Sequence, residues 1–363
     1  RPMPVNYTDE LRISYLRAAI AGQTEAEDAV RAYRAFFEGE QGVVLTTRQK
    51  EYLMGRGDGQ TPTSFGNLCR RTVAVVKDRL EIRADGIAAA DAGLPKYADA
   101  ATAWWSANHM QSRQKDIYEA ALRDGSCAVL VEWDGERPVF TPNLVYDGTT
   151  GLVRFHYDND GVLLFASKRW RQWDTKMMSA VGKIRLNLYL DDRVERYEED
   201  GRQASGWRLL DNAEVAAVTG GVVTTNPQAW VDRQDAPLGI PCVAFEVPGG
   251  SALTDVVTIQ KLLNHGLGEF DIAVDRHNWP MLWAKGLRKG ESIDVGTERM
   301  MILPENGDLG RLDPPDLQRM FQSGVLSWID MLALVKGWPA YVLNRSQQPP
   351  SGVALRIMES GLI

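Results

Sequence analysis

The sequence predicts a mixed α+β protein, and three observations carry this prediction. The first third of the chain places apolar residues three and four positions apart, which is the period of an amphipathic helix. From Cys127 to about Glu246 apolar and polar residues alternate, as they do in strands with one buried face. The last third holds two long stretches of helical period around a short, strand-rich insert. A length of 363 residues suggests two or three domains.

Helices are expected throughout the N-terminal part. Thr8 can cap a helix whose apolar face holds Leu11, Leu16 and Ile20. Further helices are expected at about residues 25–38 and 65–80, in a segment that covers Trp104, Trp105 and Met110, and at about 113–124. Gly125 ends the last of them.

The strand region is expected to be one meander of antiparallel strands. Turn signals at Asp134-Gly135, Asn159-Asp160-Gly161 and Asp200-Gly201 separate its segments. The expected strands cover about residues 128–133, 138–141, 152–158, 162–170, 183–190, 194–198, 207–210 and 243–246.

Two long helices are expected at about 254–277 and 315–336, each roughly 33–36 Å long at 1.5 Å per residue. Short strands are expected between them, at about 281–284, 300–303 and 309–312. The insert is too small to be a stable domain, and an isolated helical hairpin cannot cover its own apolar stripes. These stripes must therefore be buried against the rest of the chain or against copies of it, and we favour copies.

A polar loop follows the second long helix. Pro339 and the pair Pro349-Pro350 cannot continue a helix. Ser351 then stands where an N-cap is needed, and a helix is expected to resume at Val353. Arg345 is the only charged residue of this loop.

The sequence contains no recognised catalytic or metal-binding motif. It lacks a GxxxxGK[ST] phosphate-binding loop, and Asp124-Gly125-Ser126 does not fit the Gly-x-Ser-x-Gly frame. None of its four histidines stands at metal-ligand spacing from Cys, Asp or Glu. We therefore expect neither an enzyme nor a bound metal or cofactor. The three cysteines lie far apart in apolar stretches, which predicts buried, reduced thiols.

Charge and hydropathy argue against a protein that grips nucleic acid over a broad surface and against a membrane-spanning protein. A net charge of −7 disfavours broad gripping of phosphates, although like charge lets DNA slide past a surface without sticking. The basic and aromatic segment Lys168-Arg169-Trp170-Arg171 is interpreted as a solvent-edge strand rather than a nucleic-acid platform. No apolar run reaches the 18 residues that indicate a membrane span.

Several segments together resemble the portal proteins of tailed double-stranded-DNA bacteriophages, in particular the siphophage type. They are NLCRRTVAVVKDRLEI (67–82), DIYEAALRDGSCAVLVEWD (116–134), LLNHGLGEFDIAVDRHNWPMLWAKG (262–286), and the tail from GWPAYVL to QPPSGVALRIMESGL. The resemblance covers most of the chain and rests on the order of these segments, since no single motif is diagnostic.

This resemblance implies a portal-type α+β fold with named parts. Residues 1–250 would form the wing, with N-terminal helices followed by the β meander. Residues 251–277 and 315–337 would be the two stem helices, and 278–314 a small α/β clip between them. Residues 338–351 would be the tunnel loop, and 352–363 the start of a helix towards the crown, cut off at Ile363.

The resemblance also implies site residues. The tunnel loop lining the DNA channel would present Tyr341, Asn344, Arg345, Ser346, Gln347 and Gln348. The clip would dock the terminase through Lys285, Arg288, Lys289, Glu291 and Asp294. Subunit contacts in the stem would involve Leu263, Leu267, Phe270, Phe321 and Trp328.

The implied function is a ring, usually of twelve copies, at one capsid vertex of the virion. It would be assembled in the host cytoplasm and would pass double-stranded DNA without sequence specificity during packaging and ejection. Its other partners would be the terminase large subunit, a head-completion or adaptor protein, and the major capsid and scaffolding proteins, with no membrane. Two alternatives stay open: a DNA-processing enzyme with a helical-hairpin insertion, and a structural ring or connector protein of another assembly.

Overall fold

A computed structural model describes most of the chain, and it confirms the mixed α+β class with antiparallel sheets. The residues that it describes are 9–21, 23–41, 47, 66–83, 95–144, 151–174, 179–203, 206–219, 221–278, 282–285, 307–311 and 316–338. The chain forms two compact units. The first comprises Arg1–Glu38 and Cys69–Thr254, and the second comprises Gly39–Leu68 and Asp255–Ile363.

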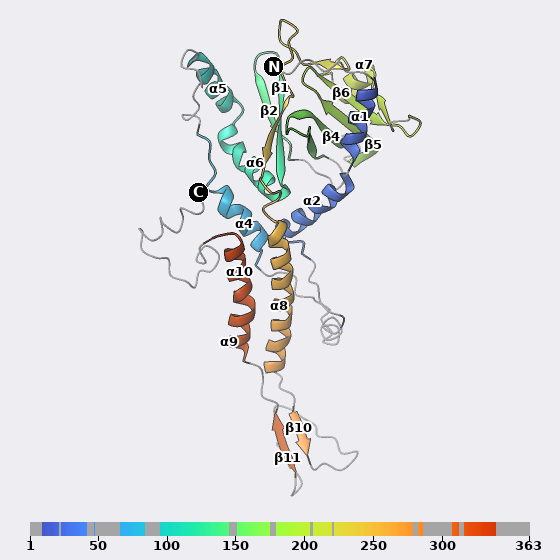
Figure 1. Cartoon of the computed structure of the whole chain (residues 1–363). Coiled ribbons are helices and arrows are strands. Elements are labelled where there is room, and N and C mark those ends of the chain that lie inside the picture. Colours follow the sequence, from blue (N-terminus) through green and yellow to red (C-terminus); the bar gives the residue numbers. More distant parts are fainter. Residues whose placement is uncertain are drawn as a thin grey trace. The chain divides into compact units, whose positions relative to one another are not determined.

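The first unit carries helices at its N-terminal end and strands after them (Figure 1). Its helices are α1 (Asp9–Ile20), α2 (Gln23–Glu38), α4 (Leu68–Lys77, whose first residue belongs to the second unit), α5 (Pro95–Ala107), α6 (Met110–Asp124) and α7 (Asn212–Val218). Its strands are β1 (Ser126–Trp133), β2 (Pro138–Pro142), β3 (Val153–Tyr157), β4 (Leu163–Asp174), β5 (Ser179–Tyr189), β6 (Arg193–Glu199), β7 (Trp207–Leu209), β8 (Gln228–Ala229) and β9 (Cys242–Glu246).

These strands form two antiparallel sheets. The larger has the order β3-β4-β5-β6-β7, with β8 paired to β6, and the smaller has the order β2-β1-β9. The expectation of a single meander is therefore wrong. β9 returns from the far end of the strand region to pair with β1, so that Ala128 lies opposite Ala244. Such a long-range pairing leaves no signal in the local period of either strand.

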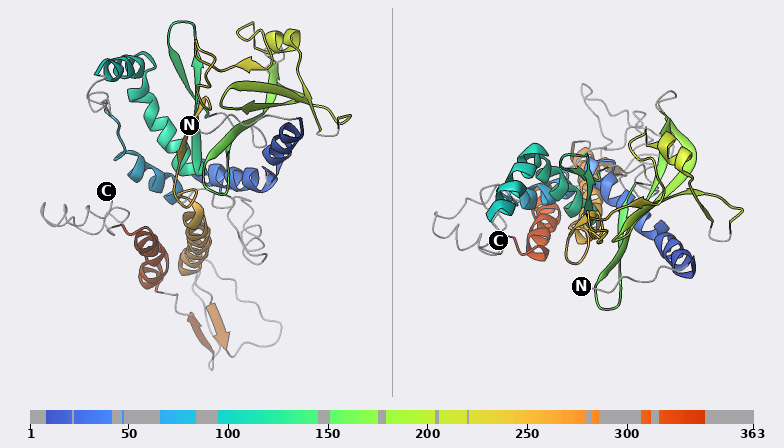
Figure 2. Two further views of the ribbon diagram at one scale, coloured as in Figure 1. Left: turned by 45° about the horizontal axis from the view of Figure 1, so that its top comes forward. Right: turned by 90° about the horizontal axis from the view of Figure 1, so that it is seen from above.

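The apolar residues arrange the first unit in four layers. One face of the larger sheet packs against α1, with Phe165, Leu188 and Tyr197 meeting Leu16. Its other face packs against the smaller sheet in a cluster of buried side chains made by Ala128, Val153, Ala166, Tyr189, Val194 and Cys242. The outer face of the smaller sheet is covered by α6, which the left view of Figure 2 shows beside β1 and β2.

Three local expectations are also wrong in the first unit. Met110 does not belong to the helix of Trp104, because His109 adopts a left-handed conformation (φ 53°) that ends α5 and lets α6 begin. The segment Lys168–Arg171 is an edge strand only in part, because β4 pairs with β3 as far as Lys168 and the residues after Lys168 pair with β5 alone. The helix expected at 65–80 spans only Leu68–Lys77. The sequence reading did not foresee α7 or β8.

The three thiols are free and buried, as expected. Burial raises the pKa of Cys69, Cys127 and Cys242 to about 12 each, so all three are protonated and unreactive at neutral pH. Among the helices that the structure describes, none is both long and apolar enough to span a bilayer.

The environment of His156 predicts that the stability of the first unit depends on pH. Its ring stacks on Phe165 at 4.2 Å between centroids, and its Nε2 lies 3.0 Å from the Ser167 hydroxyl. Burial, helped by the charge of Arg154, lowers the pKa of His156 to about 4. As the pH falls, His156 therefore binds a proton near pH 6.5 in the unfolded chain but only near pH 4 in the folded chain.

The contribution of neutral His156 to the free energy of unfolding is complete above about pH 6.5. The free energy of unfolding is expected to fall by about 1–2 kcal/mol as the pH drops towards 4. His156→Gln, which keeps a partner for Ser167, should lose this part of the pH dependence. The check is thermal unfolding at a series of pH values, with His265→Gln on α8 as the control that keeps the dependence. An unchanged slope in His156→Gln would show that another group is responsible.

Candidate functional site

The second unit contains an antiparallel helical hairpin. Its first arm is α8 (Thr254–Asn278), which confirms the helix expected at 254–277. Its second arm runs through α9 (Leu317–Met320), η2 (Phe321–Leu326) and α10 (Ser327–Val335), which lie beside α8 in Figure 1. One continuous α-helix was expected for the second arm, and this is wrong at η2, where the backbone forms a π-helix.

The ends of the second arm follow from local chemistry. Asp316 is the N-cap, and its Oδ1 accepts a hydrogen bond from the Arg319 backbone N–H at 3.0 Å. At the other end Gly337 takes a positive φ of 65°, and the Trp338 N–H bonds back to the Ala333 carbonyl. A glycine in this conformation ends a helix while satisfying its last carbonyls.

Three contacts fix the register of the two arms. The Phe270 and Phe321 rings lie 5.3 Å apart between centroids. A Cβ placed on Gly266 would stand 2.0 Å from the Trp328 ring, so the indole occupies the space that a side chain would need. Lys336 lies 3.9 Å from Asp255 in a half-exposed ion pair.

Two buried amide side chains on α8 form hydrogen bonds to segments that are distant in sequence. We call Gln260 and Asn264 the polar ladder. The Gln260 Oε1 accepts the Leu68 backbone N–H at 2.8 Å, and its Nε2 donates to the Asn264 Oδ1 at 2.7 Å. Asn264 in turn donates to the Gln41 Oε1 at 2.8 Å. Gln260 and Asn264 are both buried, and buried amides are costly unless bonded in this way. The ladder therefore specifies where the segments at Gln41 and Leu68 lie.

The hairpin leaves large apolar side chains in solvent. We call Leu262, Met331, Leu334 and Val335 the outer apolar patch; their exposed fractions are 44%, 48%, 81% and 50%. Met331, Leu334 and Val335 stand at i, i+3 and i+4 of α10 and so share one face of that helix. Leu332 and Ala333, by contrast, are buried. Helical period alone does not single out Leu334, which is the most exposed of the four.

The five predicted stem residues lie within the hairpin. Leu263 is buried and Leu267 is half-buried. Phe270, Phe321 and Trp328 are half-buried and make the arm-to-arm contacts given above. Their role in contacts between subunits stays a prediction.

The insert between the arms contains a two-stranded antiparallel ribbon. β10 (Leu282–Lys285) pairs with β11 (Asp308–Arg311), in agreement with two of the three short strands expected there. The Trp283 indole covers Gly310, where a Cβ would come within 2.6 Å of the ring. Lys285, exposed and opposite Asp308, is the one predicted docking residue among those described.

The other predicted site residues fall outside the described residues. They are the docking residues Arg288, Lys289, Glu291 and Asp294, and the loop residues Tyr341, Asn344, Arg345, Ser346, Gln347 and Gln348. The strand expected at 300–303 and the helix expected from Val353 also fall there.

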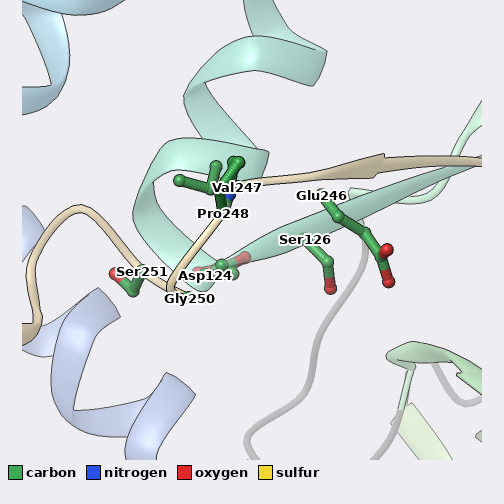
Figure 3. Close-up of a pocket in the computed structure, with 8 residues that line it drawn as sticks. Asp124, Ser126, Glu246, Val247, Pro248, Gly250 and Ser251 are labelled. Carbon is green, nitrogen blue, oxygen red and sulfur yellow. The ribbon is translucent and has the colours of Figure 1, made fainter.

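The first unit has an open pocket of about 630 Å³ where α6, β1 and β9 meet a glycine-rich turn (Figure 3). It is lined by Asp124, Gly125, Ser126, Glu246, Val247, Pro248, Gly250 and Ser251. Both of its carboxylates are engaged. Asp124 bonds to Arg34 and Arg123, and Glu246 accepts a hydrogen bond from the Tyr157 hydroxyl at 2.9 Å. Within the described part of the chain, no group of three or more His, Cys, Asp or Glu side chains is placed to hold a metal ion.

No protein-family model matches the chain. A search of curated proteins also returns no match.

Proposed function

We propose that this chain is the subunit of a ring that serves as the portal of a tailed double-stranded-DNA bacteriophage. The observation that carries the proposal is the outer apolar patch on a hairpin of two long helices. Large apolar side chains exposed together on one helix face, as Met331, Leu334 and Val335 are, indicate a site of protein association. Burying a fully exposed Leu, Met or Val side chain contributes about 1.5–3 kcal/mol. Leu262, Met331 and Val335 are already about half-buried, so each would contribute about half of that and Leu334 most of it.

Assembly into a ring would explain why the outer apolar patch lies mainly on the second arm of the hairpin. Rotation about a central axis makes each contact heterologous, so that a surface on one subunit meets a different surface on the next. The patch is concentrated on α10, whereas the exposed face of α8 also carries Thr258, Lys261 and Glu269. A neighbouring subunit would cover the patch on each copy, and closure would leave none exposed.

Two further parts of the chain would serve the DNA-channel role. The β10–β11 ribbon is inserted between the arms, where the resemblance implies docking of the terminase and later of a head-completion protein. The loop after Trp338 would place one Arg345 per subunit around the channel. Such a ring of single cations would touch phosphates weakly and repeatedly, without reading sequence.

Electron microscopy of the purified chain tests the proposal. We expect end-on views of closed rings, usually of twelve copies, around a channel at least about 20 Å wide, as duplex DNA requires. A chain that stays monomeric at every concentration examined would contradict the ring, and closed rings with a much narrower channel would contradict the DNA role.

A further inference from the structure

Two partly buried cations, Lys168 and Arg196, lie in one row across the larger sheet. Lys168 on β4 stands opposite Asn187 on β5, and Asn187 stands opposite Arg196 on β6. Residues directly opposite one another in antiparallel strands share a face of the sheet. Lys168 also stands opposite Val153, which belongs to the cluster of buried side chains between the two sheets. The row therefore faces the smaller sheet, and its two cations are two strand spacings apart, about 10 Å between backbones.

The donor groups of this row lack acceptors. Among the residues that the structure describes, Lys168 has no partner for a side-chain hydrogen bond or an ion pair. Arg196 donates from Nη2 to the Gln228 Oε1 at 2.8 Å, which orients the guanidinium, whereas its buried Nη1 meets no acceptor in the same part of the chain. Buried donors and charges are ordinarily paired, because taking them out of water is costly. The two cations of this row are therefore exceptions that require an explanation.

The carboxylate nearest in its effect on this row contacts neither cation. Burial lowers the pKa of Lys168 and that of Arg196, and the charge of Glu132 opposes both shifts. Glu132 stands on β1 four residues after Ala128, which belongs to the cluster between the sheets, so it is on the face of β1 towards the larger sheet. It is exposed and forms an ion pair with neither Lys168 nor Arg196. Two cations thus share one carboxylate, which leaves an excess of positive charge.

We propose that Lys168 and Arg196 bind a free tetrahedral oxyanion, of which inorganic phosphate is the simplest, between the two sheets. The anion would accept hydrogen bonds from the Lys168 ammonium and from the Arg196 Nη1, over Asn187, whose Nδ2 already donates to the Tyr189 hydroxyl. Donors that come from two separate strands require oxygens pointing in more than one direction, which suits a tetrahedral anion better than a planar carboxylate. Glu132 would compete with the anion for the same cations. This inference goes beyond the ring function and does not depend on it.

Substitutions in the row should change the affinity for phosphate in opposite directions. Lys168→Met and Arg196→Met keep much of the aliphatic stem and remove the charge, so each should weaken binding at least about tenfold. Glu132→Gln removes the competing carboxylate and should tighten binding about two- to fivefold. Arg17→Met is the control and should leave the affinity unchanged, because Arg17 is an exposed cation on α1, at the opposite face of the larger sheet.

The measurement is calorimetric titration of inorganic phosphate into the full chain. Sodium chloride keeps the ionic strength constant, so that general screening does not differ between samples. We expect saturable binding of one phosphate per chain, lost in Lys168→Met and in Arg196→Met but kept in Arg17→Met. The proposal would be overturned by a lack of saturable binding to the unaltered chain, or by one affinity shared by all these variants.

Glu132→Gln keeps the test decisive if the variants of the partly buried cations fold poorly, since position 132 is exposed. An affinity for phosphate that does not rise in this variant would contradict the site. Dimethyl phosphate is the second probe, because it has the single charge and two free oxygens of a nucleic-acid phosphodiester. It should bind at least about tenfold more weakly than inorganic phosphate. Equal or tighter binding of dimethyl phosphate would overturn the assignment to a free anion.

Discussion

Replacing Leu334 by glutamate is expected to leave the chain folded and to abolish the proposed assembly into rings. Leu334 is 81% exposed, so its replacement should change the free energy of unfolding of the isolated chain by less than about 0.5 kcal/mol. In a ring, each interface would lose the burial of a leucine, about 1.5–3 kcal/mol, and would also have to desolvate a carboxylate. The penalty recurs at every interface, which is why the expected effect on assembly is complete.

The measurement is molar mass by light scattering, together with electron microscopy, over a range of protein concentrations. Val222→Glu is the matched control, because Val222 is 85% exposed but lies in the first unit, outside the hairpin. Rings should persist in Val222→Glu. Rings of normal size in Leu334→Glu would remove the outer apolar patch from the subunit contact, even if the chain still assembles through another surface.

Replacing Gly266 by leucine is expected to destabilise the hairpin by about 3 kcal/mol or more, because the Trp328 ring occupies the space next to Gly266. A Cβ alone would come within 2.0 Å of that ring, so the indole must leave its place against α8. Glycine in the middle of a 25-residue helix otherwise costs about 1 kcal/mol relative to alanine. Its presence at position 266 is therefore explained by the close approach of the second arm.

Urea denaturation of Gly266→Leu, Trp328→Ala and the double variant forms a cycle that tests this explanation. If the two residues share one space, the double variant should be more stable than the sum of the two single changes implies, by about 1–3 kcal/mol. Trp328→Ala alone removes the indole without a clash. Strict additivity would show that Gly266 and Trp328 are not in contact, and the register of the hairpin would have to be revised.

The sequence predicted the features that depend on local period. The first long helix and most strands of the first unit were placed within a few residues, because their apolar positions recur at 3.6 or 2. The features it missed depend on distant partners. The pairing of β9 with β1 joins residues more than a hundred positions apart, and the apolar spacing around η2 does not reveal its π-helical backbone.

The candidate site could be predicted in part for the same reason. Helical period identifies Phe270, Phe321 and Trp328 as apolar positions, but it does not tell which of them pack within the hairpin. Leu334 looks like any other leucine of an apolar helix, and only the burial of its neighbours Leu332 and Ala333 shows that it faces outwards. The resemblance to portal proteins assigned roles to particular residues of the hairpin. The contacts and exposed fractions of these side chains show which substitutions can test those roles.

The polar ladder on α8 has a consequence for the order in which the protein can fold during synthesis. Gln41 and Asn264 are separated by 223 residues; the part Cys69–Thr254 of the first unit is encoded between them, and its other part, Arg1–Glu38, precedes Gln41. The first unit can therefore complete its core on the ribosome, whereas the second must wait until α8 has emerged. Closing a loop of that length carries an entropic cost of about 5 kcal/mol. That entropic cost falls if the intervening chain is already compact. A first unit that folds during synthesis would therefore lower the entropic cost of bringing Gln41 and Asn264 together.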